Sequence, residues 1–148
     1  MNDDVLALLR YYPQIYLACH VDHVRARRNP HALSARDASL LTHLDREHGI
    51  NAAALARHMG VRPSTLSAAL ARLERLGYIE RDNDPADARV HRLRLSAQGE
   101  IAMAESSVLD PERAAALLAR LRPDELERAL EGLALLARAA RELGGEES

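Results

Sequence analysis

The sequence is poor in aromatic residues: it contains neither Phe nor Trp, and only four Tyr. Its hydrophobic core must therefore be built from Leu, Ala, Val and Ile. Ala and Leu lose little free energy on entering a helix, and the β-branched residues that favour strands are scarce in this chain. The composition predicts a mainly helical fold, and 148 residues are enough for one domain.

The chain also contains a single cysteine, Cys19, which excludes an intramolecular disulfide framework and a cysteine-rich zinc site. It has no charged-then-apolar leader and no apolar run of about eighteen residues, the length that a membrane helix needs. It has no Gly-rich phosphate loop, nucleophile elbow or paired metal motif. We therefore expect a cytoplasmic protein that is not an enzyme, uses no cofactor and has no membrane partner.

The charge is distributed unevenly along the chain, although the formal net charge is only −2. Residues 57–94 contain eight Arg and five acidic residues, whereas residues 95–148 contain six Arg and eleven acidic residues. Nucleic acids are bound by local basic patches and not by the average charge of a chain. The basic middle segment is therefore the part expected to bind a nucleic acid.

An apolar stripe at helical spacing predicts a long first helix, which Asn29 and Pro30 end. Pro13 lies inside this helix and removes one of its hydrogen bonds, so we expect the helix to break or restart near Tyr12. The stripe consists of Val5, Leu8, Leu9, Tyr12, Tyr16, Cys19 and His23.

A second helix is expected to begin after Ser34, because Asp37 follows three residues later in the pattern of a capping box. Its apolar face extends to His48, and Gly49 supplies the expected C-terminal cap.

The next two helices have the spacing of a helix-turn-helix. Asn51 is a good N-terminal cap for a helix over 52–59, and Pro63 fits the first turn of a helix over about 63–76. A glycine-containing turn joins them. In a helix-turn-helix the second helix lies in the major groove of DNA.

A β-hairpin is predicted directly after the helix-turn-helix. Residues 78–81 have the pattern of a strand, residues 82–87 are rich in turn formers, and residues 90–95 alternate apolar with basic side chains. Such a hairpin is the wing of a winged helix. Three further helices are expected to start at Ser96, Asp110 and Pro123, and the last of them to run to Gly144.

Several dispersed motifs follow one another over residues 33–99: LS at 33–34, ALARHMGV at 54–61, STLS at 64–67, LERLGYIER at 73–81, DPADAR at 84–89 and LSAQG at 95–99. Together they resemble the bacterial multiple-antibiotic-resistance regulator (MarR) family. The resemblance implies a mainly α fold with a small β-hairpin wing. It also implies a winged helix-turn-helix DNA-binding region over residues 33–96 and a helical dimerisation region formed by residues 1–32 and 97–148.

The candidate DNA-binding residues lie on the second helix of the helix-turn-helix and on the wing. The N-terminal end of that helix contacts base edges in this docking mode, which makes candidates of Arg62, Pro63, Ser64, Thr65 and Ser67. An alternative is that Ser64 and Thr65 only satisfy backbone groups at the helix start. We expect Arg72 to contact a DNA phosphate. Arg81 is expected either to contact a phosphate or only to solvate the exposed face of its strand. The resemblance implies that Arg89 enters the minor groove, where negative potential is concentrated, and that Asp87 orients it.

A second candidate site lies on the first predicted helix. Tyr12, Tyr16, His20 and His23 could line a pocket for a small effector, which the resemblance implies to be aromatic, although core packing explains the tyrosines equally well. Cys19, His20 and His23 also have the chemistry to bind a metal ion or to sense an oxidant. No further histidine or carboxylate pattern completes such a site, and we predict no metal.

The function that we predict is that of a homodimeric repressor, which binds an inverted-repeat operator in double-stranded DNA and is released by a small effector. A dimer is expected because the terminal helices carry wider apolar stripes than one small domain needs. Two alternatives remain. The chain could be a helical protein-interaction module on a winged-helix scaffold, or a metal- or redox-sensing regulator that uses Cys19, His20 and His23.

Overall fold

The computed structural model describes residues 1–21, 31 and 33–146. Within these residues the chain forms seven helices and one antiparallel hairpin, which confirms the mainly helical fold with a small wing. The elements are α1 (Asp3–Cys19), α2 (Ala35–Leu41), α3 (Ala52–Met59), α4 (Pro63–Arg75), β1 (Ile79–Asn83), β2 (His91–Leu95), α5 (Ala97–Glu105), α6 (Pro111–Leu118) and α7 (Pro123–Glu146).

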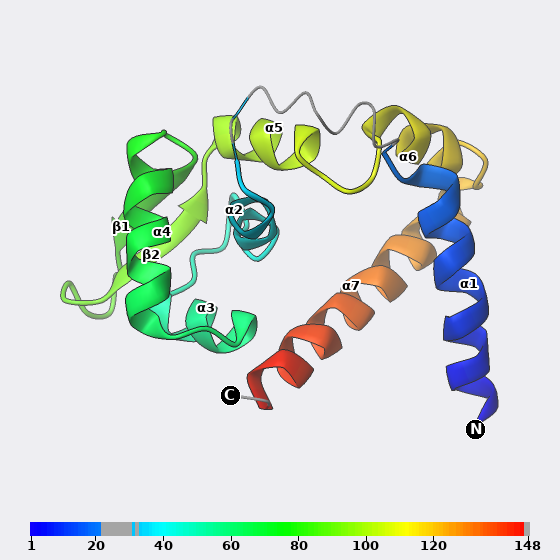
Figure 1. Ribbon diagram of the computed structural model, residues 1–148, viewed down its shortest axis with the longest axis horizontal. Helices are drawn as coiled ribbons and strands as arrows, with labels where there is room; N and C mark the ends of the chain where they lie inside the picture. Colours follow the sequence, from blue (N-terminus) through cyan, green and yellow to red (C-terminus); the bar gives the residue numbers. More distant parts are fainter. Residues whose placement is uncertain (22–30, 32, 147–148) are drawn as a thin grey trace.

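The elements separate into two groups (Figure 1). Helices α2, α3 and α4 and the hairpin gather on one side and form what we call the winged-helix lobe. Helices α1 and α6 pack together on the other side, and the long helix α7 runs from α6 back to α3. The largest buried side chains of the winged-helix lobe are Leu40, Leu41, Leu55, Leu73 and Leu93, so its core is built from leucine as the composition predicts.

The local signals for the helix-turn-helix are confirmed by its geometry. The side chain of Asn51 accepts a hydrogen bond from the backbone N–H of Ala54 at 2.8 Å, and Gly60 ends α3 with φ of 63°. Gly77 ends α4 with φ of 81°. Only glycine adopts such a left-handed conformation without strain, so these two residues fix where the helices stop.

The predicted hairpin is present, and its register places apolar side chains on the core side. Ile79 pairs with Leu95 and Arg81 pairs with Leu93. Ile50 extends the pairing, because its N–H donates to the carbonyl of Leu93 at 3.0 Å and its carbonyl accepts from the N–H of Leu93 at 2.8 Å. The base of the wing is therefore tied to the loop that precedes α3.

Two predictions for the first helix were wrong. Helix α1 runs through Pro13 without a break, and it ends at Cys19, well before Asn29 and Pro30. The surroundings of Pro13 are exposed, where water can replace the hydrogen bond that the proline removes. The helix ends because the chain becomes extended and pairs with the segment before α6. The carbonyl of Cys19 accepts a hydrogen bond from the N–H of Asp110 at 2.7 Å.

The predicted end of the second helix was also wrong. Ser34 caps its start as expected, with its hydroxyl accepting from the N–H of Asp37 at 3.0 Å, but the helix stops at Leu41 and not at His48. The side chain of Asp45 accepts from two following backbone N–H groups and holds a turn there. Gly49 is no helix cap; it allows close approach of β2, since a Cβ at this position would lie 2.7 Å from that of Arg92.

The last helix extends two residues beyond the predicted Gly144 and ends at Glu146. In the described part of the chain, no helix is long and apolar enough to cross a membrane.

Candidate nucleic-acid interface

The N-terminal end of α4 is exposed and carries no side-chain cap. Helices α1, α2, α3, α5 and α6 each begin with a side chain that accepts a hydrogen bond from the first turn, whereas Arg62, the residue before α4, makes none. The first turn of α4 therefore presents backbone N–H groups and the positive end of its dipole to solvent. An anion such as a phosphate group is the natural partner for such a helix end.

Small exposed side chains surround this helix end. Pro63, Ser64, Thr65 and Ser67 are all exposed, while Leu66 points into the core. Within the described residues, the hydroxyls of Ser64, Thr65 and Ser67 take part in no hydrogen bond. The alternative reading, in which Ser64 and Thr65 serve the backbone at the helix start, has no support from the structure.

The tip of the wing holds Arg89 in a fixed position. The Nε of Arg89 donates to Oδ1 of Asp87 and its Nη2 donates to Oδ2, each at 3.1 Å, while its backbone N–H donates to Oδ1 at 3.0 Å. The Arg89 guanidinium and then its backbone N–H lower the pKa of Asp87 below its ordinary value. The side chain of Arg89 is nevertheless 91% exposed. A bidentate carboxylate thus orients a guanidinium that projects into solvent.

The turn beneath Arg89 is held by Asp84. The side chain of Asp84 accepts from the N–H of Ala86 at 2.8 Å and from Nε of Arg92 at 3.0 Å, and these two contacts, in that order, lower its pKa. Arg92 also donates to the carbonyl of Gly49 at 2.9 Å. Arg92 therefore stabilises the turn and the base of the wing.

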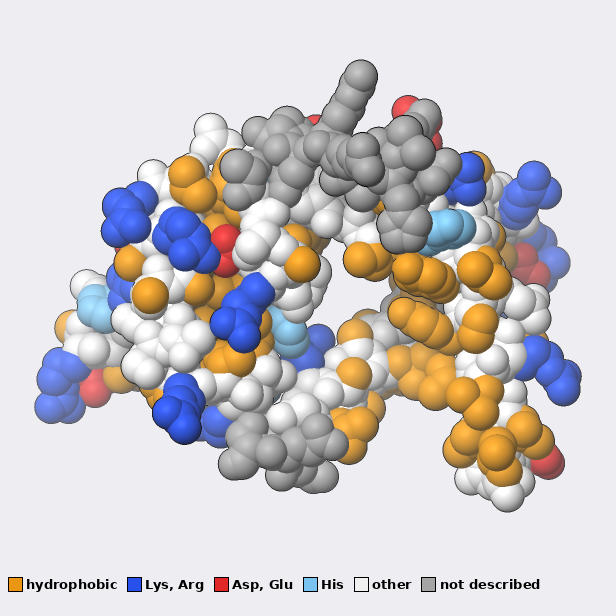
Figure 2. Space-filling model, in the orientation of Figure 1, with side chains coloured by type: hydrophobic (Ala, Val, Ile, Leu, Met, Phe, Trp, Pro, Cys, Tyr) orange, Lys and Arg blue, Asp and Glu red, His pale blue; other side chains and the backbone are white. Residues whose placement is uncertain are grey.

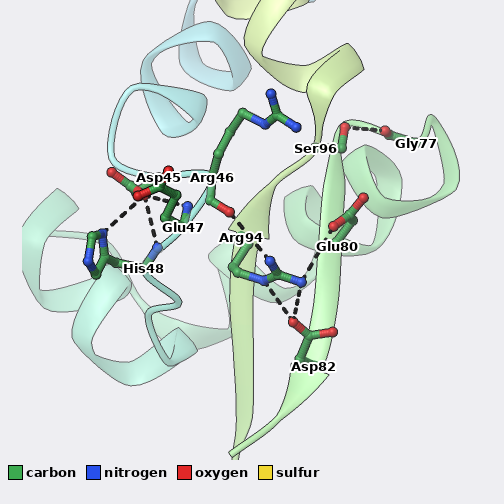
Figure 3. Close-up of polar contacts among 9 residues, drawn as sticks. All are labelled: Asp45, Arg46, Glu47, His48, Gly77, Glu80, Asp82, Arg94 and Ser96. Carbon is green, nitrogen blue, oxygen red and sulfur yellow. Dashed lines mark hydrogen bonds and ion pairs between the residues drawn. The ribbon is translucent and has the colours of Figure 1, made fainter.

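Arg94 has a similar structural role (Figure 3). It reaches across the hairpin to Asp82, with Nε 2.7 Å from Oδ2, and to Glu80, with Nη2 3.6 Å from Oε2. Its Nη1 also donates to the carbonyl of Arg46 at 3.4 Å. Arg81 pairs with Glu74 of α4 at 3.3 Å. These arginines connect the wing to the rest of the lobe, and Arg89 is the arginine that extends from its tip.

Arg72 is directed towards α2. Its Nη2 lies 2.5 Å from Oδ1 of Asp37, a residue that is only 4% exposed. The guanidinium is half exposed, so it lies at the edge of the lobe and not in its interior. The structure thus gives Arg72 a contact within the lobe that the sequence analysis did not anticipate.

The residues predicted to line an effector pocket are brought together only in part. Tyr16 stacks on His20, with ring centroids 5.7 Å apart, and Nδ1 of His20 lies 2.9 Å from the carbonyl of Leu17. Tyr12 contributes to a different feature, an apolar groove between α1 and α7. His23 lies outside the described residues.

Cys19 is buried at the end of α1, against α6, with 1% of its surface exposed. His20 follows the helix in an extended conformation, so the helical spacing assumed for His20 and His23 does not apply at His20. Over residues 1–21, 31 and 33–146, no three or more His, Cys, Asp or Glu side chains are grouped as metal ligands would be.

Comparison with known proteins identifies this architecture. Residues 33–91 match the model of the MarR family, a segment that includes α2, α3, α4 and the hairpin up to the start of β2. This segment is therefore similar to the MarR family, as its motifs predict. A search of curated proteins finds no matching sequence.

Several solved structures share the fold over nearly the whole chain. A mutant of MepR from a multidrug-resistant S. aureus clinical isolate is 21% identical and has a TM-score of 0.64, with 94% of this chain and 99% of that chain covered. A transcriptional regulator from Thermotoga maritima is 20% identical, with a TM-score of 0.57 and coverage of 95% and 96%. A second S. aureus MepR mutant, solved bound to an oligodeoxyribonucleotide, is 18% identical, with a TM-score of 0.53 and coverage of 94% and 98%.

The MarR-family motifs did not reveal every residue that shapes this lobe. Asp37 was predicted only as the capping-box partner of Ser34, yet its carboxylate forms the ion pair with Arg72. His43, His58 and Arg141 gather around a cavity and were not singled out at all. They come from three distant parts of the chain, so no local spacing could have indicated that they meet.

Proposed function

We propose that the chain is a homodimeric transcription repressor of the MarR family that binds an inverted-repeat operator in double-stranded DNA. One observation carries this proposal: the uncapped, exposed N-terminal end of α4 and the oriented guanidinium of Arg89 belong to the same small lobe. A helix end for the major groove and an arginine for the minor groove are the two contacts that a winged helix needs. The S. aureus MepR mutant of similar fold was solved with DNA bound, which supports the same use of this lobe.

In this proposal the contacts divide into base reading and backbone positioning. Arg62, Pro63, Ser64, Thr65 and Ser67 approach base edges, where small hydroxyls can donate or accept. Arg89 occupies the minor groove, with Asp87 holding it in place. Arg72 and Arg81 each pair with an acidic residue of the lobe but stay partly exposed, so each can also contact a phosphate at its rim.

The dimer that we propose uses the terminal helices, residues 1–32 and 97–148, and leaves the lobe over residues 33–96 free for DNA. Cys19 is the buried residue of α1, and several large apolar side chains of α1 and α7 are exposed. Orange hydrophobic side chains cover the face of α1 in Figure 2. Between the two helices lies a groove of about 540 Å³, lined by Leu8, Leu9, Tyr12, Pro13, Leu133, Leu136, Ala137 and Ala140. A second copy of the chain is its proposed occupant, because a two-fold dimer matches a two-fold operator.

Release of DNA is assigned to a small aromatic effector. Tyr16, His20 and His23 remain the proposed lining of its pocket, between the dimerisation helices and the lobe, whereas Tyr12 lines the groove proposed for the second copy. The effector would lower DNA affinity only by preferring a dimer in which the two α4 helices no longer fit both half-sites.

The test is to purify the protein from its own cells with the DNA that it retains, sequence that DNA, and titrate the recovered site at several salt concentrations. We expect an inverted repeat whose affinity falls steeply with salt, because phosphate contacts release counterions. Recovery of protein partners without enriched DNA would favour the interaction-module alternative instead.

A further inference from the structure

Residues 84–90 form the loop between β1 and β2, which we call the tip loop, and it projects from the winged-helix lobe in Figure 1. The N–H of Asp84 donates to the carbonyl of Val90 at 2.8 Å, and the N–H of Val90 donates to the carbonyl of Asp87 at 3.0 Å. Arg89 lies within this loop, directly before Val90. The position of Arg89 therefore depends on how the rest of the lobe holds the two ends of the tip loop.

The carboxylate of Asp84 connects the tip loop to β2. Its Oδ1 accepts from the N–H of Ala86 at 2.8 Å, and its Oδ2 accepts from Nε of Arg92 at 3.0 Å. The side chain of Asp84 is only 15% exposed, in contrast to the exposed guanidinium of Arg89. Asp84 thus supports the tip loop from inside and is not a group that the loop presents to solvent.

Arg92 continues the connection to the segment that precedes α3. Its Nη1 donates to the carbonyl of Gly49 at 2.9 Å, and a Cβ on Gly49 would lie only 2.7 Å from the Cβ of Arg92. The two residues after Gly49 are Ile50, which pairs with Leu93, and Asn51, which caps α3. A short series of contacts therefore runs from the tip loop to the start of the helix-turn-helix.

The negative charge of Asp84 is informative in this place. A carboxylate in an element that approaches DNA is repelled by the phosphates. An uncharged Asn could accept the hydrogen bond from Ala86 equally well, because its side-chain oxygen holds the same kind of turn. The carboxylate alone provides a charge-assisted hydrogen bond to Arg92. The feature that requires Asp84 is therefore its pair with Arg92.

We propose that Asp84 and Arg92 are positioning residues, which fix the tip loop against the segment before α3 and so determine where the guanidinium of Arg89 lies relative to α4. They act through Arg89 and do not contact DNA. A loop that is already ordered loses less conformational entropy when it binds, and this raises its affinity. The inference rests on the proposed function, since the position of Arg89 affects DNA affinity only if Arg89 binds DNA.

The first experiment needs no DNA and compares two variants with wild type. Asp84→Asn keeps an acceptor for Ala86 but loses the charge partner of Arg92. Arg92→Lys keeps the positive charge but lacks the planar fork that reaches both Asp84 and Gly49. Backbone ¹⁵N heteronuclear NOE values measure order on the ps–ns timescale. We expect them to fall over the tip loop in both variants and to stay unchanged over α4, which also shows that the variants are folded.

Glu80→Gln is the matched control. It removes one negative charge from an exposed position on β1, and Arg94, the partner of Glu80, keeps its hydrogen bond to Asp82. The order of the tip loop should be that of wild type. A tip loop that stays equally ordered in Asp84→Asn and in Arg92→Lys would overturn the proposal, whatever the protein binds.

The second experiment measures affinity for a random-sequence duplex at low salt, because an arginine in the minor groove contributes mostly sequence-independent attraction. Loss of a negative charge alone should strengthen binding, as we expect for Glu80→Gln. The proposal predicts the opposite sign for Asp84→Asn, a weakening of about 3- to 10-fold. Arg92→Lys should weaken binding by a similar factor with an unchanged salt slope, because its charge is retained.

The same changes in an Arg89→Ala background separate positioning from direct contact. There neither Asp84→Asn nor Arg92→Lys should weaken binding further, since the side chain that they position is gone. An equal loss in both backgrounds would show that Arg92 acts independently of Arg89 and would overturn the proposal, as would tighter binding by Asp84→Asn. A wild type that binds no duplex would refute the proposed function itself, whereas a wild type that binds no better than these variants would refute only this inference.

Discussion

The carboxylate of Asp37 and the guanidinium of Arg72 lie 2.5 Å apart and connect α2 to α4. Asp37 is buried at 4% exposure, whereas half of the Arg72 side chain reaches solvent. The pair therefore connects α2 to α4 and helps to fix the angle of α4 within the lobe.

Replacement of Arg72 by Gln should destabilise the protein. The change leaves a buried carboxylate without its cationic partner, and we expect the free energy of unfolding to fall by about 1–3 kcal/mol, since solvent at Arg72 screens part of the loss. Urea unfolding followed by circular dichroism measures this. Arg75→Gln, at an exposed position on the same helix, is the matched control and should change stability by less than about 0.5 kcal/mol. Equal stability of both variants would mean that the ion pair contributes nothing.

Two glycine substitutions should change stability in opposite directions. A Cβ at Gly99 would lie 2.1 Å from the carbonyl oxygen of Tyr78, so Gly99→Ala must displace the backbone of α5 or of Tyr78, which precedes β1, and should cost about 3 kcal/mol. A Cβ at Gly132, within α7, meets no atom within 4 Å. Gly132→Ala should therefore stabilise the helix by about 0.5–1 kcal/mol. Thermal melts of the two variants, compared with wild type, test both signs.

The winged-helix lobe was largely predictable from the sequence because its signals are local. Asn51, Pro63, Gly60 and Gly77 act within one helical turn, and the alternation over residues 90–95 reports a strand directly. The boundaries that were wrong depend on contacts between distant segments. Helix α1 ends where residues 108–110 pair with its C-terminus.

The candidate site was predictable to a similar degree. The resemblance to the family implied that Asp87 orients Arg89, and the structure shows that contact. The sequence could not show that Arg72, Arg92 and Arg94 bind acidic residues and carbonyls of their own lobe, because ion pairs between elements follow from packing and leave no periodic pattern. The role of each residue at DNA remains a prediction.

Acidification should weaken the folded state through His43. Its pKa is lowered on folding from the ordinary 6.5, so below that pH the unfolded chain binds a proton that the folded chain resists. Stability should therefore fall as the pH drops from 6.5 towards the lower folded pKa. His43→Gln should reduce the decline in melting temperature over this window, and His91→Gln, at an exposed position on β2, should not. A melting temperature of wild type that is flat with pH would contradict the assignment.

The dimer should depend on the groove between α1 and α7. Sedimentation of the wild type should give about twice 16.3 kDa. Leu136→Arg places a charge among the apolar side chains of the groove and should raise the dimer dissociation constant at least about 100-fold. Glu131→Arg adds the same side chain on the other face of α7 and should leave the dimer intact. A wild-type protein that is monomeric at micromolar concentration would refute both the dimer and the inverted-repeat operator.

The central claim, that this lobe binds DNA through α4 and the wing, is tested most directly by titrating wild type, Arg89→Ala and Thr65→Ala against a specific and an unrelated duplex at three salt concentrations. Arg89→Ala should weaken both duplexes by similar factors and reduce the salt slope by about one, because the arginine contributes mostly sequence-independent attraction. Thr65→Ala should cost about 1–3 kcal/mol on the specific duplex alone and leave the salt slope unchanged. If Arg89→Ala leaves affinity and salt slope unaltered on every duplex, the hairpin is not a DNA-binding wing.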